Sequence, residues 1–251
     1  MMISKNRISE IRKLHSKKFR EELGIFIVEG VKSVKMLLGS DFDVVEVFTT
    51  HESRSANSAW LEMLDNVTEI SPSDMDRIST MQTSPEILAI VKQRITLPEI
   101  PDNQPVLALD HISDPGNLGT ILRTADWFGI HHVVCSMDCV ELYNPKTIQA
   151  TMGSFINVNV RKLNLPEFLK RAAEKRRIIG TFMDGKSVPD FGFQTSDIVV
   201  IGNEANGISK DVAEIVTEKV TIPRFKEGKT NAESLNAAIA ASILMYSWRI
   251  K

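Results

Sequence analysis

Cysteine and long apolar runs are both scarce in this sequence. Its 251 residues contain two cysteines, Cys135 and Cys139, four positions apart and with no second pair. We therefore expect neither a disulfide framework nor a structural zinc site, and a reducing, cytoplasmic compartment fits best. No run of 18 or more apolar residues occurs, and no apolar segment follows the basic N-terminal stretch, so we expect neither a membrane span nor a secretory signal. His131 and His132 stand in a strand-like run without a carboxylate cluster, so we expect no metal centre.

Two familiar nucleotide-binding loops are also missing. Gly202 and Gly207 are followed by Ile-Ser, not by the Lys-Ser/Thr of a Walker loop. No Gly-x-Gly-x-x-Gly string of a dinucleotide fold occurs. A carboxylate at Glu204 would repel phosphate, so phosphate binding does not explain this glycine-rich stretch.

Apolar, β-branched runs alternate with helical patterns along the chain. Several of the runs are unbroken rather than alternating, as expected for strands that are covered on both faces. The predicted strands are residues 43–48, 86–91, 105–110, 131–136, 176–183 and 197–202. The predicted helices are residues 29–39, 117–128, 165–176 and about 231–248. This order indicates an α/β fold with a mostly parallel sheet.

A proline-rich stretch divides the chain. Pro98, Pro101 and Pro105 cannot continue a helix or a central strand. We read residues 95–104 as a linker between a small α/β domain, residues 1–94, and a larger α/β domain, residues 105–251.

Charge is distributed unevenly. Residues 1–35 hold nine Lys or Arg against four Glu, although the net charge of the whole chain is −2. A basic segment on an otherwise acidic protein could meet nucleic-acid phosphates. The simpler interpretation is a solvated helix whose apolar stripe is Ile8, Ile11 and Leu14.

Three polar loops follow predicted strands, where ligands gather in an open parallel sheet. In DPGNLGTILR, Asn117 is placed to cap a helix, and Arg123 lies off its apolar stripe. A helix cap and a surface ion pair are the simplest interpretations of these two residues. In the second loop, GNEANG, Glu204 could pair with an arginine such as Arg123.

The third loop leads from Ile222-Pro223 into the last helix. Thr230 and Glu233 fit a capping box, which predicts that the helix starts there. Ser234 and Asn236 would then lie in its first turn, among free backbone N–H groups. The alanine-rich remainder also suits a core or dimer-face helix.

Together, the three loops resemble the motifs of the SpoU/TrmH family of RNA ribose 2′-O-methyltransferases, within the SPOUT superfamily. The first motif corresponds to Asn117-Leu-Gly119 with Arg123, and the second to the stretch from Ile201 to Gly207. The third corresponds to Ile222-Pro223 followed by Ser234-Leu235-Asn236.

The resemblance reaches the N-terminus. Lys18-Phe19-Arg20 and the stretch from Phe26 to Gly30 look like the family's substrate-binding domain, which is similar to a small ribosomal protein. With that support, RNA contact becomes the favoured role for Lys17, Lys18 and Arg20.

The resemblance implies a trefoil-knotted C-terminal domain that binds S-adenosylmethionine, acts as a homodimer and needs no metal. The implied catalytic residues are Arg123, Asn117, Glu204, Ser234 and Asn236, with Glu204 pairing with or orienting Arg123. The implied cofactor-binding residues are Gly202, Gly207, Ile222, Pro223 and Leu235.

Several alternatives stay open. Ribosomal RNA is the commoner substrate for chains with this N-terminal domain, and transfer RNA is the alternative. A non-catalytic RNA-binding protein would be expected to lose Arg123, Glu204 or Asn236, and all three are present. Base or protein methyltransferases of the same fold generally lack this combination of motifs. The segment 224–233 is longer than in many relatives, and it lies where the cofactor is expected.

Overall fold

The computed structural model describes residues 3–224 and 234–250, and the chain forms two compact units. The first unit comprises residues 1–96 and 143–156, and the second comprises 97–142 and 157–251. The sequence places residues 143–156 in the second domain, whereas the structure groups this segment with the first. Among the described residues, no helix has the length and apolar character that a membrane crossing requires.

The first unit is built on a mixed four-stranded sheet. Its strands are β1 (Ile25–Glu29), β2 (Val44–Thr49), β3 (Val67–Glu69) and β4 (Ile87–Lys92). They are ordered β1-β4-β2-β3, with β4 antiparallel to both of its neighbours and β3 parallel to β2. The strands predicted at 43–48 and 86–91 are confirmed as β2 and β4.

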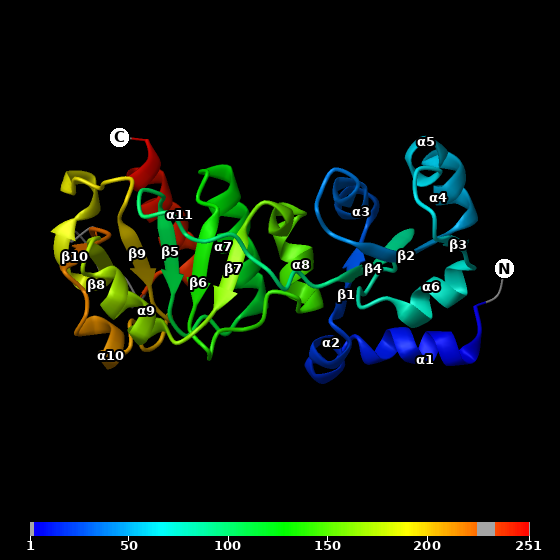
Figure 1. Ribbon diagram of the computed structural model, residues 1–251, viewed down its shortest axis with the longest axis horizontal. Helices are drawn as coiled ribbons and strands as arrows, with labels where there is room; N and C mark the ends of the chain where they lie inside the picture. The colour runs from blue at the N-terminus through cyan, green and yellow to red at the C-terminus, as the bar shows by residue number, and fades with distance from the viewer. Residues whose placement is uncertain (1–2, 225–233, 251) are drawn as a thin grey trace. The chain divides into compact units, whose positions relative to one another are not determined.

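Helices cover both faces of this sheet. On one face, α1 (Lys5–Lys13) and α6 (Pro72–Ile78) pack together, opposite α3 (Val31–Leu37) (Figure 1). Ile8, Ile11 and Leu14 are buried there, as the apolar stripe predicts. The remaining helices of the unit are α2 (Lys17–Leu23), α4 (His51–Ala56), α5 (Ser58–Leu61) and α8 (Pro145–Thr151).

Aromatic contacts hold the segment 143–156 to the first unit. The ring of Phe26 on β1 lies 4.4 Å from that of Tyr143 and 5.9 Å from that of Phe155, between ring centroids. Asn144 caps α8 and Pro145 occupies its first turn. Asn-Pro is thus a local start signal for a helix that the sequence prediction missed.

The second unit contains a six-stranded, all-parallel sheet, in agreement with the mostly parallel sheet predicted from the sequence. Its strands are β5 (Val106–Leu109), β6 (His132–Cys135), β7 (Asn159–Lys162), β8 (Ile178–Ser187), β9 (Ile198–Ile201) and β10 (Glu218–Thr221). They are ordered β10-β8-β9-β5-β6-β7. From β5 the chain first adds strands on one side and then returns to the other. The order therefore switches between β5 and β9, which is where open α/β sheets bind ligands.

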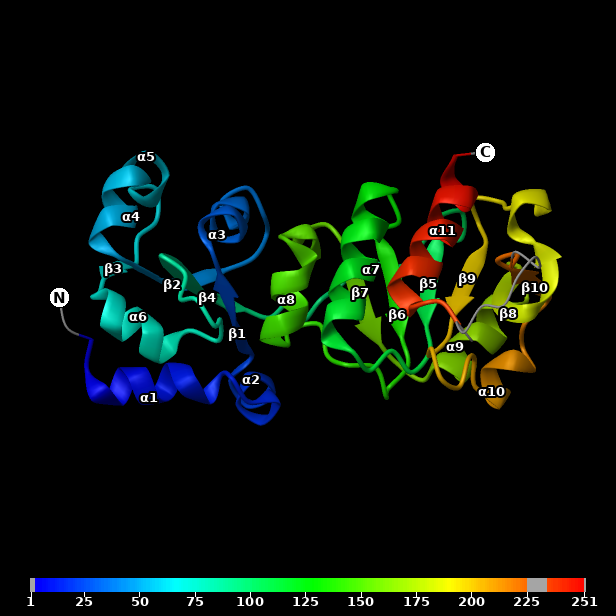
Figure 2. The ribbon, with the colours of Figure 1, turned by 180° about the vertical axis from the view of Figure 1, so that it is seen from behind.

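Alternate residues of the central strands enter two separate cores. Leu107 and Leu109 of β5 face α7 (Pro115–Trp127) and α11 (Ala237–Arg249), which lie side by side in Figure 2. Val106 and Ala108 face the core of α9 (Leu165–Ala172) and α10 (Lys210–Ala213) on the opposite side. The central strands β5, β6 and β9 are thus buried on both faces, which explains their unbroken apolar runs.

The two helices at the switch point begin at residues other than those predicted. Asp114, not Asn117, caps α7, and its side chain accepts the N–H of Asn117 at 2.7 Å. Asn236 caps α11, and residues 234–236 are not helical, so the helix does not begin near residue 231. Thr230 and Glu233, the predicted capping box, lie outside the described residues.

Candidate active site

Three side chains from distant segments join by hydrogen bonds at the carboxyl edge of the second sheet. Asn117 of α7 donates from Nδ2 to Glu204 Oε1 at 2.5 Å. Asn236 donates from Nδ2 to Asn117 Oδ1 at 2.9 Å. The N–H of Ala237 donates to the same oxygen of Glu204 at 3.1 Å. One residue from each of the three motifs thus contributes to one network.

The direction of each hydrogen bond in this network is fixed. Asn236 Oδ1 accepts the N–H groups of Ala238 and Ile239, which can only donate. Its amide nitrogen must therefore face Asn117, whose own nitrogen must then face Glu204. The chain ends on a carboxylate, which accepts two donors at Oε1. Asparagine at both 117 and 236 thus follows from the polarity of the network.

A tight turn presents Glu204. Asn203 and Gly207 exchange two backbone hydrogen bonds, of 3.0 and 2.8 Å, and Gly207 has φ +67°. A Cβ at Gly202 would lie 2.2 Å from the carbonyl carbon of Gly207. Both glycines are therefore required by the turn itself, whatever ligand it meets.

Arg123 and Ser234 stand apart from the network. Arg123 is exposed on α7, and within the described part of the chain it makes no hydrogen bond or ion pair. In place of the expected pairing with Arg123, Glu204 accepts a hydrogen bond from Asn117. Ser234 is exposed just before α11, likewise without a hydrogen bond to another described residue.

The remaining predicted cofactor residues lie at the two ends of the undescribed segment. Ile222 is half-buried against the core under α11, whereas Pro223 is exposed. Leu235 is 46 % exposed, which is high for an apolar side chain. The N–H groups of Ile222 and Leu235 form no hydrogen bond with other described residues. Residues 225–233 of the longer segment 224–233, where the cofactor is expected, lie outside the described residues.

The N-terminal basic residues divide into two groups. Lys17 and Lys18 are exposed on α2, and Lys17 Nζ lies 3.5 Å from Glu21 Oε1. Arg20 is only 1 % exposed, and its Nη1 donates to the carbonyl oxygen of Leu14 at 2.6 Å. Arg20 is therefore a structural residue of the first unit, and the expectation that it contacts RNA is not met.

Sequence reasoning missed a second layer of polar residues behind the network. Asp110, 1 % exposed, follows β5 and accepts the N–H of Ser209 at 2.8 Å. His111 Nδ1 lies 2.7 Å from Asp110 Oδ1, and this hydrogen bond raises the pKa of His111 above its usual 6.5. Asn203 donates from Nδ2 to the His111 carbonyl at 3.1 Å. In the sequence, these residues are marked by their position alone: Asp110 and His111 follow β5, and Asn203 follows β9.

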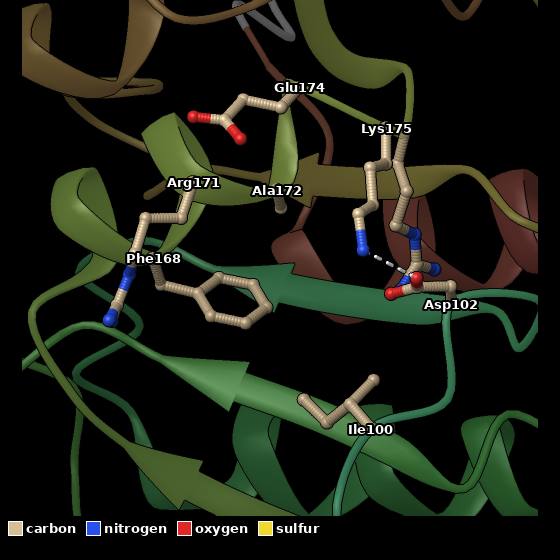
Figure 3. A pocket seen from close by; sticks show the side chains of 8 residues that line it. Ile100, Asp102, Phe168, Arg171, Ala172, Glu174 and Lys175 are labelled. Atoms are coloured by element: carbon tan, nitrogen blue, oxygen red, sulfur yellow. Dashed lines mark hydrogen bonds and ion pairs between the residues drawn. The ribbon is translucent and has the colours of Figure 1, made fainter.

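A separate hollow of about 510 Å³ lies beside α9 (Figure 3). Phe168 and Ile100 form its apolar lining, and Lys175 Nζ pairs with Asp102 Oδ2 at 3.1 Å. None of the predicted site residues lines it. Among the described residues, no group of three or more His, Cys, Asp or Glu could hold a metal ion. The network at the strand ends is therefore the stronger candidate for the active site.

Comparison with family models identifies both parts of the chain. Residues 104–246 match the model of the SpoU rRNA Methylase family, and residues 5–89 match that of the MRM3-like substrate binding domain. The chain belongs to the SpoU family. This agrees with the resemblance read from the three motifs.

Individual SpoU relatives cover nearly the whole chain. The 23S rRNA (guanosine(2553)-2′-O)-methyltransferase RlmP of Bacillus subtilis is 30 % identical over 97 % of this chain and 96 % of its own length. A TrmH-family structure from Porphyromonas gingivalis is 35 % identical, with a TM-score of 0.86 over 99 % of both chains. An AdoMet-bound rRNA methyltransferase from Sinorhizobium meliloti is 25 % identical, with a TM-score of 0.85 over 99 % of this chain and 96 % of that one. The expected α/β architecture is thus shared with SpoU and TrmH methyltransferases.

Proposed function

We propose that this protein transfers a methyl group from S-adenosylmethionine to a ribose 2′-hydroxyl of ribosomal RNA. The observation that carries the proposal is the network of Asn117, Glu204 and Asn236, which unites the three family motifs at the sheet's switch point. Its relatives in Bacillus subtilis and Streptomyces viridochromogenes are named as 23S rRNA 2′-O-methyltransferases. Ribosomal RNA also implies a cytoplasmic site of action.

The residues around α11 fit the cofactor. Ile222 and Leu235 offer apolar surface, and their N–H groups, which form no hydrogen bond with another described residue, can bind polar edges of an adenosine. Gly202 and Gly207 keep the neighbouring turn free of side chains, and Pro223 follows Ile222. We assign these five residues to the cofactor site, within a trefoil-knotted domain. The bound cofactor supplies a methyl group already activated on a sulfonium sulfur.

The protein must then align the 2′-oxygen with the methyl carbon, and alignment can supply a large share of the acceleration. We assign the catalytic roles to Arg123, Asn117, Glu204, Ser234 and Asn236. The guanidinium of Arg123 neutralises the neighbouring phosphate and orients the hydroxyl through charge-assisted hydrogen bonds. Oε2 of Glu204, which forms no hydrogen bond within the described residues, can accept one from the substrate or from an arginine.

The first unit serves as the RNA-binding domain. Residues 1–94 form this domain, and residues 95–104 are the linker to the methyltransferase domain. Lys17 and Lys18 are exposed and can reach phosphates without rearrangement of the fold. The match to a substrate-binding domain over residues 5–89 supports this assignment.

The protein acts as a homodimer through the α7–α11 face. Ile239, Ile243 and Tyr246 of α11 and its C-cap Ile250 form an exposed stripe at helical spacing. Trp127, 84 % exposed, adds to the apolar surface on α7. A second copy of the chain that covers this face would bury the apolar stripe. That copy would also contact Arg123, which lies on α7 together with Trp127.

Methyl transfer tests the reaction. Radiolabelled S-adenosylmethionine is incubated with rRNA and tRNA pools and with wild type, Arg123→Ala and Arg171→Ala. Arg171 is a matched control because it is an exposed arginine of α9, on the opposite face of the sheet. We expect alkali-resistant label in rRNA that disappears only with R123A. Label in tRNA alone would change the substrate class, and failure to bind the cofactor would favour a non-catalytic RNA-binding protein.

Subunit mixing tests the dimer. R123A and E204A are each expected to be inactive alone. If Arg123 serves the partner's site, a mixed dimer contains one site with both residues intact, and activity returns on mixing. Ile243→Asp should convert the dimer to monomers in sedimentation. Monomeric wild type would contradict the dimer, and no recovery on mixing would place Arg123 in its own subunit's site.

A further inference from the structure

One asparagine, Asn203, ties the turn that carries Glu204 to the loop after β5. Asn203 Oδ1 accepts the N–H groups of Ala205 and Asn206, at 2.9 and 3.3 Å, which closes the turn from within. Its Nδ2 points the other way and donates to the His111 carbonyl at 3.1 Å. Because backbone N–H groups only donate and a carbonyl only accepts, the orientation of this amide is fixed.

The His111 carbonyl is itself a fixed anchor. His111 adopts φ 59°, an unusual backbone conformation for a residue with a side chain. Its N–H donates to Ser136 Oγ at 3.0 Å, and its ring bonds to the buried Asp110. The loop after β5 is therefore held from β6 on one side and by Asn203 on the other.

These contacts form one continuous path to the predicted catalytic residues. It runs from the loop after β5 through Asn203 to the turn, and from Glu204 in that turn to Asn117. If only the Nδ2 donor at 203 is lost, the turn keeps its internal hydrogen bonds but loses its tie to the β5 loop. The carboxylate of Glu204 can then drift from Asn117.

We propose that Asn203 is a positioning residue, which orients the carboxylate of Glu204 toward Asn117 by joining the Glu204 turn to the His111 carbonyl. The inference rests on the proposed methyltransferase function for its kinetic consequence, but its structural consequence is measurable without turnover. It also explains the choice of asparagine, since the position needs an acceptor on one side and a donor on the other.

Two substitutions of Asn203 distinguish loss of its Nδ2 donor from the addition of a negative charge at the same position. Asn203→Ser keeps a hydroxyl that can accept turn N–H groups but is too short to reach His111, and Asn203→Asp also sets a carboxylate against that carbonyl. We expect kcat for methyl transfer to fall about tenfold in N203S and by a larger factor in N203D. Both losses should be smaller than the roughly 10²-fold loss that a 1 Å misplacement of a catalytic group causes. The KM for RNA should stay within about twofold of wild type. Asn206→Ser and Asn206→Asp are the matched controls in the same turn, because the exposed Asn206 side chain makes no hydrogen bond to another described residue.

A double-mutant cycle with Glu204→Gln shows whether Asn203 acts through Glu204. If it does, N203S/E204Q is no slower than E204Q alone, whereas independent roles would multiply the two losses. Thermal unfolding and cofactor binding of each variant establish that the protein is folded.

Amide NMR provides the second readout. N203S should shift the side-chain NH₂ signals of Asn117, and N206S should leave them in place. Unchanged Asn117 signals, or multiplicative kinetic losses, would overturn the positioning role. Absence of methyl transfer by wild type would refute the proposed function instead, and the NMR comparison would still decide the role of Asn203.

Discussion

The exposed lysines of α2 and the asparagines of the second unit's network are held in different ways. On α2, Lys17 forms an ion pair with Glu21, four positions along the same helix. In the second unit, Asn117 bonds to residues 87 and 119 positions away in the sequence. Substitutions of the α2 lysines should therefore have additive effects, whereas substitutions within the network of Asn117 should have non-additive effects, because each one breaks the same chain of hydrogen bonds.

The largest expected effect comes from reversing one hydrogen bond of the network. Asn117→Asp is nearly isosteric but places a carboxylate oxygen against Glu204, where the network needs a donor. We expect kcat for methyl transfer to fall by roughly 10² or more, as for misplaced catalytic groups.

Asn236→Asp measures the coupling within the network. Added to N117D it should cause little further loss, because both variants break one chain of hydrogen bonds. If the losses in kcat of the two variants multiplied in the double variant, Asn117 and Asn236 would act independently of each other, as the α2 lysines are expected to do.

A buried arginine gives the next largest effect, on stability. Arg20→Met keeps much of the side-chain volume but removes the hydrogen bond to the Leu14 carbonyl. We expect a loss of about 1–3 kcal/mol in the free energy of unfolding, measured by urea titration. Lys18→Met on the same helix is the control and should change it by less than about 0.5 kcal/mol. Equal effects of the two variants would mean that burial does not distinguish these residues.

The exposed lysines should show additive, salt-dependent effects. Lys17→Ala and Lys18→Ala should each lower RNA affinity and reduce the slope of log K against log salt by about 0.7–0.9. The double variant should show the sum of the two. Lys219→Ala, an exposed lysine of the second unit, is the control. Filter binding over a salt series measures the slopes, and unchanged slopes would remove α2 from the RNA interface.

The smallest expected effect is a pH dependence of stability from His111. Its pKa is raised in the folded protein, mainly by the hydrogen bond to Asp110. Because the pKa of His111 is higher in the folded than in the unfolded state, its protonation stabilises the fold. This contribution to the free energy of unfolding is fully present at pH values below the unfolded pKa of about 6.5, and it is lost as the pH rises through the folded pKa. His111→Asn, which tolerates the same backbone conformation, should flatten this decline in urea titrations between pH 6 and 9. A decline of the same size in H111N would assign it to other groups.

The sequence alone determined the α/β class, the parallel sheet of the second unit and the three polar loops. Unbroken runs such as those of β5 and β9 are readable because a strand covered on both faces must be apolar throughout. The content and order of the three motifs indicated the family, and the apolar stripe of Ile8, Ile11 and Leu14 indicated the helix α1.

Only the tertiary structure decided what individual polar residues do. Arg20 and Lys18 look equivalent in the sequence, yet one is buried and the other exposed, because burial depends on which elements pack around α2. Asn117 reads as a helix cap until Asp114 takes that role and frees its amide for Glu204. The bonds among Asn117, Glu204 and Asn236 join segments far apart in sequence, so only the folded sheet can bring them within hydrogen-bonding distance.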